Sequence, residues 1–329
     1  MSARVAVSGA NGFVGSAVAL ALLRHGYAVR ALVRPSSDTA SLDGLDVELA
    51  RCDLLDPPSL ARALDGCEGL FHVAADYRLW APVPHAIYAA NVRGTHNILL
   101  AARHAGVDRV VHTSSVATLG LHADGSPADE TTPARLGDMI GAYKRSKFLS
   151  EALVTRCAAR GSDIVIVNPA APVGPRDRKP TPTGRTILDA ARGRMPAYVD
   201  TGLDVVHVDD VAEGHVLAYE RGQRGRRYLL GGENLSLKQI LAQVAAITGR
   251  HAPWVKLPHA AVLPVAYVAE AWARVSGHPP TVSVDAVKLA RHRMYFSHRR
   301  AETELGYHAR PAREALADAI QWFRDNGYL

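Results

Sequence analysis

The sequence has few cysteines, and this shortage excludes several classes of protein. Only Cys52, Cys67 and Cys157 occur among 329 residues, and no two of them form a CxxC pair. A disulfide-stapled scaffold is therefore excluded, and a metal site is not expected. An odd number of widely spaced cysteines in a long chain indicates reduced thiols and hence a cytoplasmic protein.

Long apolar stretches are also missing. No segment of signal-peptide length precedes Gly9, and the longest apolar run, Ala260 to Ala269, contains Pro264. A membrane span needs ~20 residues, so no transmembrane segment is expected. The apolar segment Pro258 to Trp272 is more commonly an ordinary core helix, but a peripheral contact with the inner face of the membrane is the alternative.

Runs of basic residues are absent too. The formal charge of +6 comes from scattered residues, and no five consecutive positions are all Lys or Arg. We therefore expect no nucleic-acid partner. The clusters Arg291-His-Arg293 and His298-Arg-Arg300 are interpreted as a solvated face rather than an anion site.

What the sequence does contain is enough apolar material, 48%, for a full core in two parts. In the first half, short Val-rich runs alternate with longer helical patterns, which predicts stacked βαβ units and an α/β fold with a parallel sheet. The strands are expected at Arg4 to Ser8, Tyr27 to Val33, Val47 to Cys52, Gly69 to Val73, Arg109 to Thr113 and Asp163 to Val167. The helices are expected at Phe13 to Arg24, Pro58 to Leu64, Ile87 to His104 and Met139 to Arg160.

The texture changes after Asn168. Five prolines between positions 168 and 184 argue against a helix or a central strand, so the chain is expected to leave its first domain here. Further on, Asp209 to Glu220 and Ser236 to Thr248 are predicted helices, the second opened by a Ser236/Gln239 capping box, and 199–208 contains a strand. We assign residues 1–170 and about 203–225 to a dinucleotide-binding domain, and about 171–202 and 226–329 to a substrate domain.

A glycine-rich turn follows the first strand. Gly9, Gly12 and Gly15 enclose Asn11, Phe13 and Val14 and open a helix, as a dinucleotide pyrophosphate site requires. The spacing is GxxGxxG rather than GxGxxG, and a tight turn without a ligand is the alternative. The position between strand and helix favours cofactor binding.

Arg34 ends the second strand, where an acidic residue would bind the ribose 2′-hydroxyl of NAD and an arginine would meet a 2′-phosphate. Asp38 lies beyond Pro35, too late to reach the ribose. We therefore favour NADP(H) over NAD(H), with a solvated surface role for Arg34 as the alternative.

Tyr143 and Lys147 stand four residues apart in a predicted helix, so they project from one face. A nearby ammonium lowers the pKa of a phenol and makes it useful in acid–base catalysis. Ser115 follows a strand at the end that faces the ligand crevice in open α/β sheets. An exposed helix face is the alternative. Packing alone, however, does not explain why a glycine turn, a strand-end serine and this Tyr and Lys pair follow one another in the chain.

These residues resemble the extended short-chain dehydrogenase/reductase family, also described as NAD-dependent epimerases and dehydratases. The resemblance covers nearly the whole chain and implies a Rossmann-type, doubly wound parallel sheet with a smaller C-terminal α/β substrate domain. A subgroup known as hopanoid-associated sugar epimerases, or dihydroflavonol-4-reductase-like proteins, is especially similar. Its likeness rests on Asp76 to Trp80, Lys179 to Arg185 and Met195 to Gly202.

The family resemblance implies a role for each matching residue. Tyr143 is the general acid/base, Lys147 lowers its pKa and holds the nicotinamide ribose, and Ser115 hydrogen-bonds the reacting oxygen, with Ser114 as a substitute if the alignment slips by one. The matching cofactor-binding positions also include Asp53 and Leu54 by the adenine, Val73, Ala74 and Ala75 along the cofactor, and Pro169 beside the nicotinamide.

The resemblance leaves two reactions open. Nucleotide-sugar members typically carry an arginine that clamps the diphosphate, and Leu203 occupies that position. This departure and Arg34 favour a reductase acting between a secondary alcohol and a carbonyl, in hopanoid or sugar metabolism. Arg176, Lys179 or Arg185 in the Pro-rich segment would supply a replacement charge for the alternative, a sugar epimerase.

Beside the cofactor segment, Asp76, Tyr77, Arg78 and Trp80 are expected to shape the pocket of a small-molecule substrate that is lipid- or sugar-linked. A surface loop with Trp80 in the core is the alternative. Related enzymes often pair through the helix that carries Tyr143 and its neighbour, so a homodimer is also expected. An NADP-sensing regulator is disfavoured, because such relatives commonly lack the Tyr and Lys pair.

Overall fold

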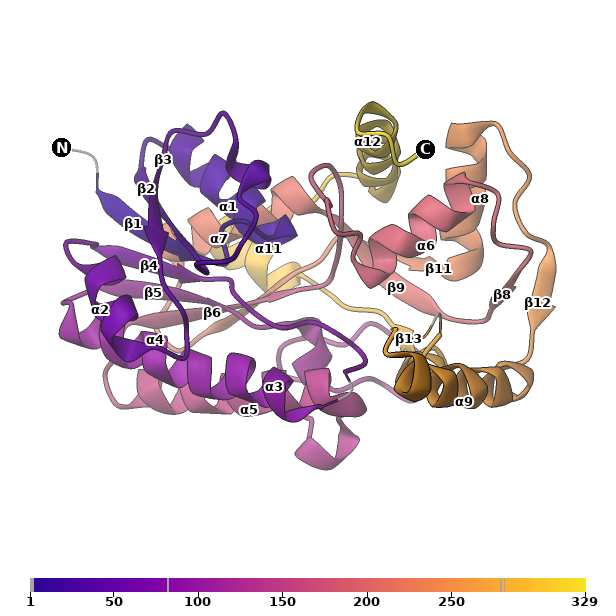
Figure 1. The fold of residues 1–329 in the computed structure, drawn as a ribbon, viewed down its shortest axis with the longest axis horizontal. Coiled ribbons are helices and arrows are strands. Elements are labelled where there is room, and N and C mark those ends of the chain that lie inside the picture. The colour runs from indigo at the N-terminus through magenta and orange to yellow at the C-terminus, as the bar shows by residue number, and fades with distance from the viewer. Residues whose placement is uncertain (1–2, 82, 279, 281) are drawn as a thin grey trace.

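A seven-stranded parallel sheet organises the larger part of the chain (Figure 1). The computed structural model describes residues 3–81, 83–278, 280 and 282–329. The strand order is β10–β6–β5–β4–β1–β2–β3, and every neighbouring pair is parallel. The strands are β1 (Arg4–Ser8), β2 (Ala28–Val33), β3 (Val47–Arg51), β4 (Gly69–His72), β5 (Arg109–Thr113), β6 (Ile164–Pro169) and β10 (Arg227–Leu230).

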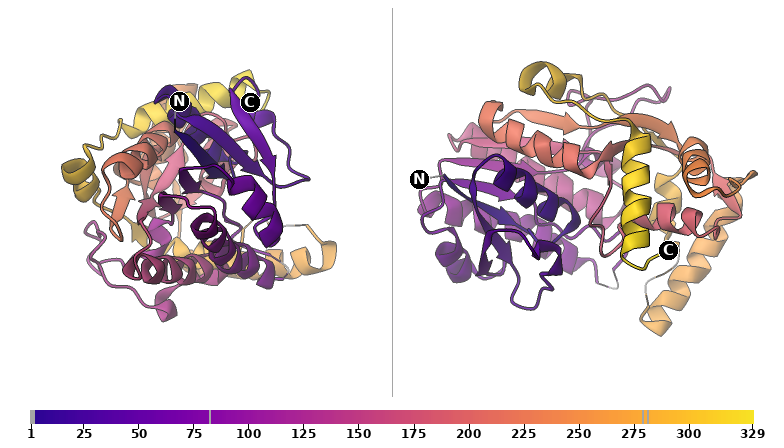
Figure 2. Two further views of the ribbon diagram at one scale, coloured as in Figure 1. Left: turned by 90° about the vertical axis from the view of Figure 1, so that its left-hand side faces the viewer. Right: turned by 90° about the horizontal axis from the view of Figure 1, so that it is seen from above.

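Helices cover both faces of this sheet, and its inner strands are buried on both sides. One face carries α1 (Phe13–Arg24), α7 (Val208–Arg221) and α11 (Arg299–Leu305), and the other carries α2 (Pro57–Leu64), α4 (Gly94–His104) and α5 (Gly141–Ala159) (Figures 1 and 2). The doubly wound Rossmann-type fold expected from the sequence is confirmed.

The predicted elements of the first half are present, with ends shifted by one or two residues. The helix predicted from Ile87 is longer and starts as α3 (His85–Tyr88), which continues through a π-helical turn (Ala89–Arg93) into α4. The helix predicted from Met139 begins instead at Gly141. A short 3₁₀ turn, η4 (Leu136–Asp138), precedes it, and Gly141 has a φ of +80°.

A smaller second sheet lies at the right of Figure 1. Its centre is β9 (Gly202–His207), which pairs with β11 (Glu233–Ser236), β13 (Arg293–Met294) and β7 (Ala171–Val173). Around it lie α6 (Pro182–Ala191), α8 (Leu237–Thr248) and α12 (Ala312–Asp325), while β8 (Ala197–Val199) pairs with β12 (Val255–Leu257). The capping box of Ser236 and Gln239 is confirmed at the start of α8.

The prediction that prolines keep the segment 168–184 free of a helix was wrong, and β7 within it is an edge strand rather than a central one. Pro182 is the first residue of α6, where the missing N–H has no intrahelical partner to lose, and Thr181 caps the helix by accepting from the Gly184 N–H at 3.1 Å. Pro172 lies in the three-residue strand β7. Position within each element, rather than proline count, decided the outcome.

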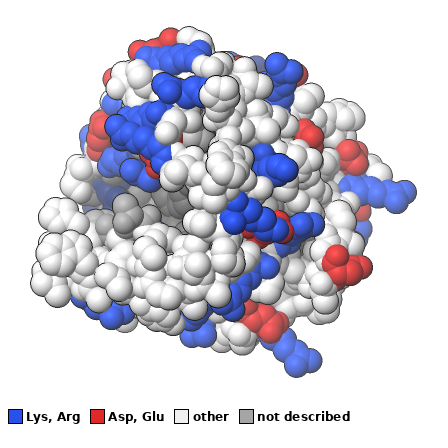
Figure 3. Space-filling view, turned by 90° about the vertical axis from the view of Figure 1, so that its right-hand side faces the viewer, with Lys and Arg blue, Asp and Glu red and all other residues white. Residues whose placement is uncertain are grey.

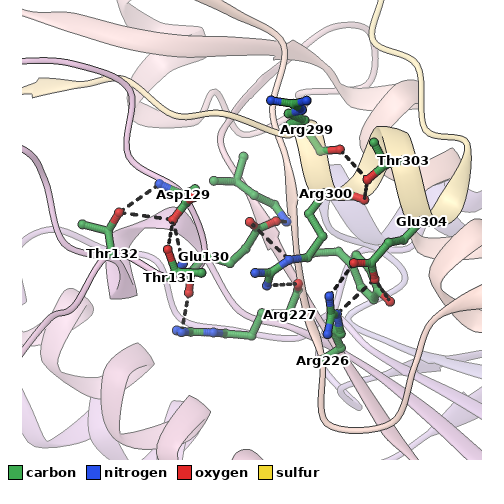
Figure 4. A network of polar contacts seen from close by, with 12 residues as sticks. Asp129, Glu130, Thr131, Thr132, Arg226, Arg227, Arg299, Arg300, Thr303 and Glu304 are labelled. Carbon is green, nitrogen blue, oxygen red and sulfur yellow. Dashed lines mark hydrogen bonds and ion pairs between the residues drawn. The ribbon is translucent and has the colours of Figure 1, made fainter.

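The chain crosses between the two sheets more than once, and the predicted domain boundaries stay a prediction. Strand β10 follows β9 of the small sheet and pairs with β6 of the large one. A polar network around buried Glu130 holds β10 in the large sheet (Figure 4). The Glu130 carboxylate accepts the Leu229 N–H at 2.8 Å and lies 3.8 Å from Arg300. The backbone carbonyl of Glu130 accepts a hydrogen bond from the Arg227 guanidinium at 2.6 Å. Arg300 is thus partly buried in an ion pair and departs from the solvated face expected of its cluster, whereas Arg299 is exposed.

A last pair of helices, α9 (His259–Ser276) and α10 (Val284–Leu289), projects from the body beside the small sheet (Figure 2). The expectation that 258–272 is an ordinary core helix was wrong, because only Ala266 and Ala273 of α9 are buried. Within the described ranges, no helix has both the length and the apolar character to cross a membrane.

Candidate active site

The glycine turn between β1 and α1 is too tight for side chains. Gly9 has a φ of +67°, and a Cβ there would lie 2.8 Å from the Ala74 Cα. A Cβ on Gly15 would lie 2.1 Å from the Gly9 oxygen, and the Gly12 N–H already donates to that oxygen at 2.9 Å. Glycine at these positions lets the backbone turn sharply and brings α1 close to the turn.

The N-terminus of α1 points its free N–H groups at this turn. Gly12 is the N-cap and supplies no side-chain cap, so the N–H groups of Phe13, Val14 and Gly15 have no intrahelical partner. With the positive end of the helix dipole they form an anion site of the kind that binds a pyrophosphate. The residues present therefore fit a dinucleotide.

Asn11 ties the glycine turn to the loop after β2. The side-chain amide of Asn11 donates to the Asp38 carbonyl at 3.0 Å, and the backbone carbonyl of Asn11 accepts from the Ser41 hydroxyl at 2.8 Å. The Asp38 carboxylate accepts the Ala40 N–H at 2.9 Å and stays exposed. This carboxylate thus caps its own loop.

Arg34 is exposed at the end of β2, and a second arginine supports it. Arg51, the last residue of β3, donates from one guanidinium nitrogen to the carbonyls of Arg34, Pro35 and Ser37 at 3.1 to 3.2 Å. Two guanidinium groups therefore stand at the end of neighbouring strands. Sequence reasoning missed Arg51, although the pairing of Val33 with Arg51 in a parallel sheet is the signal that finds it.

The other predicted cofactor positions lie at strand ends along the same edge. Asp53 caps its own turn by accepting the Leu55 N–H at 2.8 Å, and the Leu54 carbonyl accepts from Asn97 at 2.8 Å. After β4, Val73, Ala74 and Ala75 are half-buried, and the Ala74 N–H donates to Ser8 at 3.2 Å. Pro169 is buried at the end of β6.

Ser115, Tyr143 and Lys147 meet near the ends of β5 and β6. Burial raises the pKa of the Tyr143 phenol, and a hydrogen bond with the Ser115 side chain opposes that rise. Lys147 is 3% exposed, donates to the Thr113 carbonyl at 2.7 Å, and has its pKa lowered to about 8 by burial. The phenol therefore holds its proton at neutral pH, ready to donate it.

Asn168 positions the Ser115 backbone, and sequence reasoning missed this role. Its buried amide nitrogen donates to the Ser115 carbonyl at 3.0 Å and to Glu151 at 2.8 Å. Ser114, the substitute considered for Ser115, is buried and its hydroxyl has no partner among the described residues. The contact with Tyr143 belongs to Ser115.

The segment after β4 reaches the same region through Asn91. This buried residue of the π-helical turn accepts the Asp76 N–H at 2.7 Å and donates to the Asp76 carbonyl and the Ser146 hydroxyl, both at 2.9 Å. Asp76 is paired with Arg78 at 2.5 Å, so although burial favours its protonated form, Arg78 holds its pKa below the ordinary value. Trp80 is half-buried, neither in the core nor fully exposed.

A buried carboxyl that sequence reasoning also missed lies between the predicted substrate residues. Asp177 is 2% exposed, and burial raises its pKa to about 6 against opposing hydrogen bonds from Thr181 and the charge of Arg185. Desolvation raises the pKa of Tyr77, with the charge of Asp177 the next contribution. Tyr77 and Arg185 thus both lie near Asp177, whereas Arg176 is engaged with Asp209.

Comparison with known proteins identifies the family. The model of the NAD dependent epimerase/dehydratase family matches residues 5–231. The chain belongs to this family. Its members are NAD(P)-dependent oxidoreductases of the extended short-chain dehydrogenase/reductase type, so the protein is an enzyme that uses a nicotinamide cofactor.

Individual relatives of this family align over the whole chain. The protein is 47% identical to a "Putative dihydroflavonol 4-reductase" of Synechocystis sp., over 98% of this chain and 95% of that protein. It is 39% identical to "Sterol demethylase protein B" of Methylococcus capsulatus, over 98% of this chain and 99% of that protein. The crystal structure of gox2253 superposes with a TM-score of 0.89 at 52% identity and covers 100% of both chains.

Proposed function

We propose that the protein is an NADP(H)-preferring reductase that interconverts a secondary alcohol and a carbonyl. The observation that supports this most is the group of Ser115, Tyr143 and buried Lys147, together with a glycine turn that fits a dinucleotide. A bound nicotinamide supplies or accepts the hydride at its C4 atom. The chain's own residues manage the proton and the position of the reacting oxygen.

In this proposal Tyr143 is the general acid. Its phenol, protonated because burial raises its pKa, donates a proton to the carbonyl oxygen as a ketone is reduced. Ser115 hydrogen-bonds the same oxygen and fixes its distance from Tyr143. Lys147, held by the Thr113 carbonyl, orients the nicotinamide ribose and favours the phenolate that remains.

The preference for NADP(H) rests on Arg34 and Arg51. Guanidinium groups suit phosphate geometry, and Arg34 lies where a 2′-phosphate would stand. Arg51 holds the backbone of residues 34–37 in place for that contact. Asp38, the nearest carboxylate along this loop, is occupied in capping the Ala40 N–H.

The substrate we propose is a lipid-derived alcohol or ketone, of the kind handled in hopanoid metabolism. Similarity to proteins named for dihydroflavonol and for sterol demethylation supports a polycyclic compound. Leu203, where a diphosphate-binding arginine would stand, and the engagement of Arg176 with Asp209 weigh against a nucleotide sugar. The enzyme would work in the cytoplasm, where its three free thiols stay reduced, peripherally to the inner face of the membrane.

We also propose a homodimer through α4 and α5, which lie side by side on one face of the sheet. Leu100 on α4 is 44% exposed, and Phe148 and Leu149 on α5 are half-buried. A partner copy would cover these side chains.

The test begins with the cofactor, because it needs no guess about the substrate. Freshly purified protein is denatured and any released nicotinamide is identified, and the cofactor-free protein is then titrated with NADPH and NADH by fluorescence. An empty site that prefers NADPH supports the reductase, and ketone reduction is then screened. Near-stoichiometric release of NAD would instead indicate an epimerase that retains its cofactor through both half-reactions.

A further inference from the structure

The outer face of α9 is apolar, whereas the solvent face of an ordinary surface helix is polar. One stripe, called here the outer stripe of α9, contains residues spaced three and four apart: Ala261, Pro264, Val265, Val268, Trp272 and Val275. Its large side chains, Val265, Val268, Trp272 and Val275, are 59%, 71%, 69% and 81% exposed. No charged residue interrupts it.

The inner face of α9 is sufficient to hold the helix in place. Ala266 packs against Val284 and Val287 of α10, and Glu270 accepts the Val284 N–H at 2.7 Å. The His259 ring lies 2.9 Å from the Ala290 carbonyl and joins the start of α9 to the end of α10. The outer stripe therefore contributes nothing to the core.

Two further exposed apolar side chains precede the helix. Trp254, 87% exposed, and Leu257, 38% exposed, lie on the segment that leads through β12 into α9. Figure 3 shows a broad surface without charged side chains at its lower left, where α9 lies, with Lys and Arg on its borders. Exposed apolar side chains gathered on such an uncharged surface, with charged groups at its border, mark a site of interaction.

The charge around α9 indicates what the surface contacts. Residues 250–300 contain eight Lys and Arg but only two Asp and Glu. Of the eight, Lys256 and Arg293 pair with Asp200, and Arg300 pairs with Glu130. On α9, α10 and the residues after them, Arg274, Lys288 and Arg291 are exposed, whereas Glu270 and Asp285 are half-buried. Arg274 lies 3.8 Å from the Glu270 carboxylate, which neutralises part of its charge. Exposed positive charge beside an apolar helix face complements an anionic lipid surface.

The helix pair also lies against the candidate active site. The Asp285 carboxylate of α10 comes so close to Gly141 that a Cβ there would lie 2.6 Å from its oxygen. Gly141 is the first residue of α5 and precedes Tyr143 by two positions. A partner bound to α9 would therefore sit on the helix pair that contacts the first turn of the helix carrying Tyr143.

We infer that the outer stripe of α9 docks the enzyme on an anionic lipid bilayer, with Trp272 and the valines in the headgroup and acyl boundary and Arg274, Lys288 and Arg291 toward the phosphates. The inference deepens the membrane location proposed above and rests on that part of the proposal. A second copy of the chain is the competing occupant, and the dimer proposed through α4 and α5 uses a different surface.

The test is flotation of the whole protein with vesicles of phosphatidylglycerol and phosphatidylethanolamine. The wild-type protein should float with them, and high salt should weaken the binding. Val268→Glu with Trp272→Glu should lower the partition coefficient about a hundredfold, since each such side chain removed from lipid accounts for roughly a tenfold change. The matched control is Leu49→Glu, which changes another exposed side chain, 49% exposed, on β3 and should float like the wild type.

Three results would overturn the inference: wild-type protein that stays at the bottom of the gradient, a double variant that floats like the wild type, or a double variant whose mass in sedimentation equilibrium is half that of the wild type. The last would assign the stripe to a second copy. NADPH binding, measured on the same variants, reports whether the fold is intact. Because flotation requires no turnover, its failure leaves the proposed reductase activity untouched.

Discussion

Replacing Lys147 by methionine should abolish activity and yet stabilise the cofactor-free protein at neutral pH. The amine is 3% exposed, and burial lowers its pKa from 10.5 to about 8. That fall corresponds to ~3 kcal/mol by which the charged amine destabilises the fold. Methionine fills a similar volume without a charge, but it leaves the Thr113 carbonyl unpaired at a cost of about 1–2 kcal/mol. The net gain is about 1–2 kcal/mol.

The sign of the pH dependence follows from the depressed pKa. Below pH 8 both folded and unfolded chains carry the proton, and the full penalty is present. Between pH 8 and 10.5 the unfolded chain binds more protons than the folded one, so the wild-type protein gains stability as the pH rises. By pH 9.5 this gain is ~2 kcal/mol, and the advantage of the variant should disappear.

The assay is thermal unfolding of cofactor-free wild type and Lys147→Met at pH 7 and 9.5. The variant should melt a few degrees higher at pH 7, and the two should melt together at pH 9.5. Lys288→Met, which changes an exposed lysine, should show no such convergence. A Lys147 variant that melts below the wild type at pH 7, or a gap that does not change with pH, would refute the reasoning.

Three further outcomes are expected. Tyr143→Phe should lower kcat about a thousandfold with little change in NADPH affinity in a fluorescence titration, since it removes only the proton donor; a variant with full turnover would contradict that role. Arg34→Glu should weaken NADPH binding by about 10- to 100-fold and leave NADH binding nearly unchanged, whereas equal losses would remove the basis for the cofactor preference. Gly15→Ala, whose Cβ would meet the Gly9 oxygen at 2.1 Å, should lose binding of both cofactors and ~2 kcal/mol of stability in denaturant unfolding; unaltered NADPH affinity would show that the turn is not the pyrophosphate site.

Local sequence signals sufficed where the chemistry is local. The βαβ alternation, the Ser236 capping box and the glycine turn depend on residues close together in the chain, and the structure contains all of them. The prediction for the Pro-rich segment was wrong for a local reason as well. Pro182 stands at the first position of α6, where a proline costs the helix no hydrogen bond.

Features that depend on strand pairing or on burial could not be predicted from local sequence signals. Arg51 and Asn168 act through residues 14 to 53 positions away, and their partners follow from the order of strands in the sheet. Asp177 looks like any loop carboxyl until Tyr77 and Arg185 gather around it. None of the three carries a motif that sets it apart in the chain.

The sequence by itself determined the doubly wound sheet, its family and the residue types that a nicotinamide enzyme needs, because periodicity and glycine-dependent turns are properties of short segments. Only the tertiary structure decided which groups are desolvated and which stay exposed. Burial sets the pKa of Lys147 and Tyr143, and the lack of burial makes α9 an interaction surface rather than a core helix. Composition cannot distinguish a core helix from an exposed one, because an apolar helix has the same sequence pattern whether its side chains face a core or solvent.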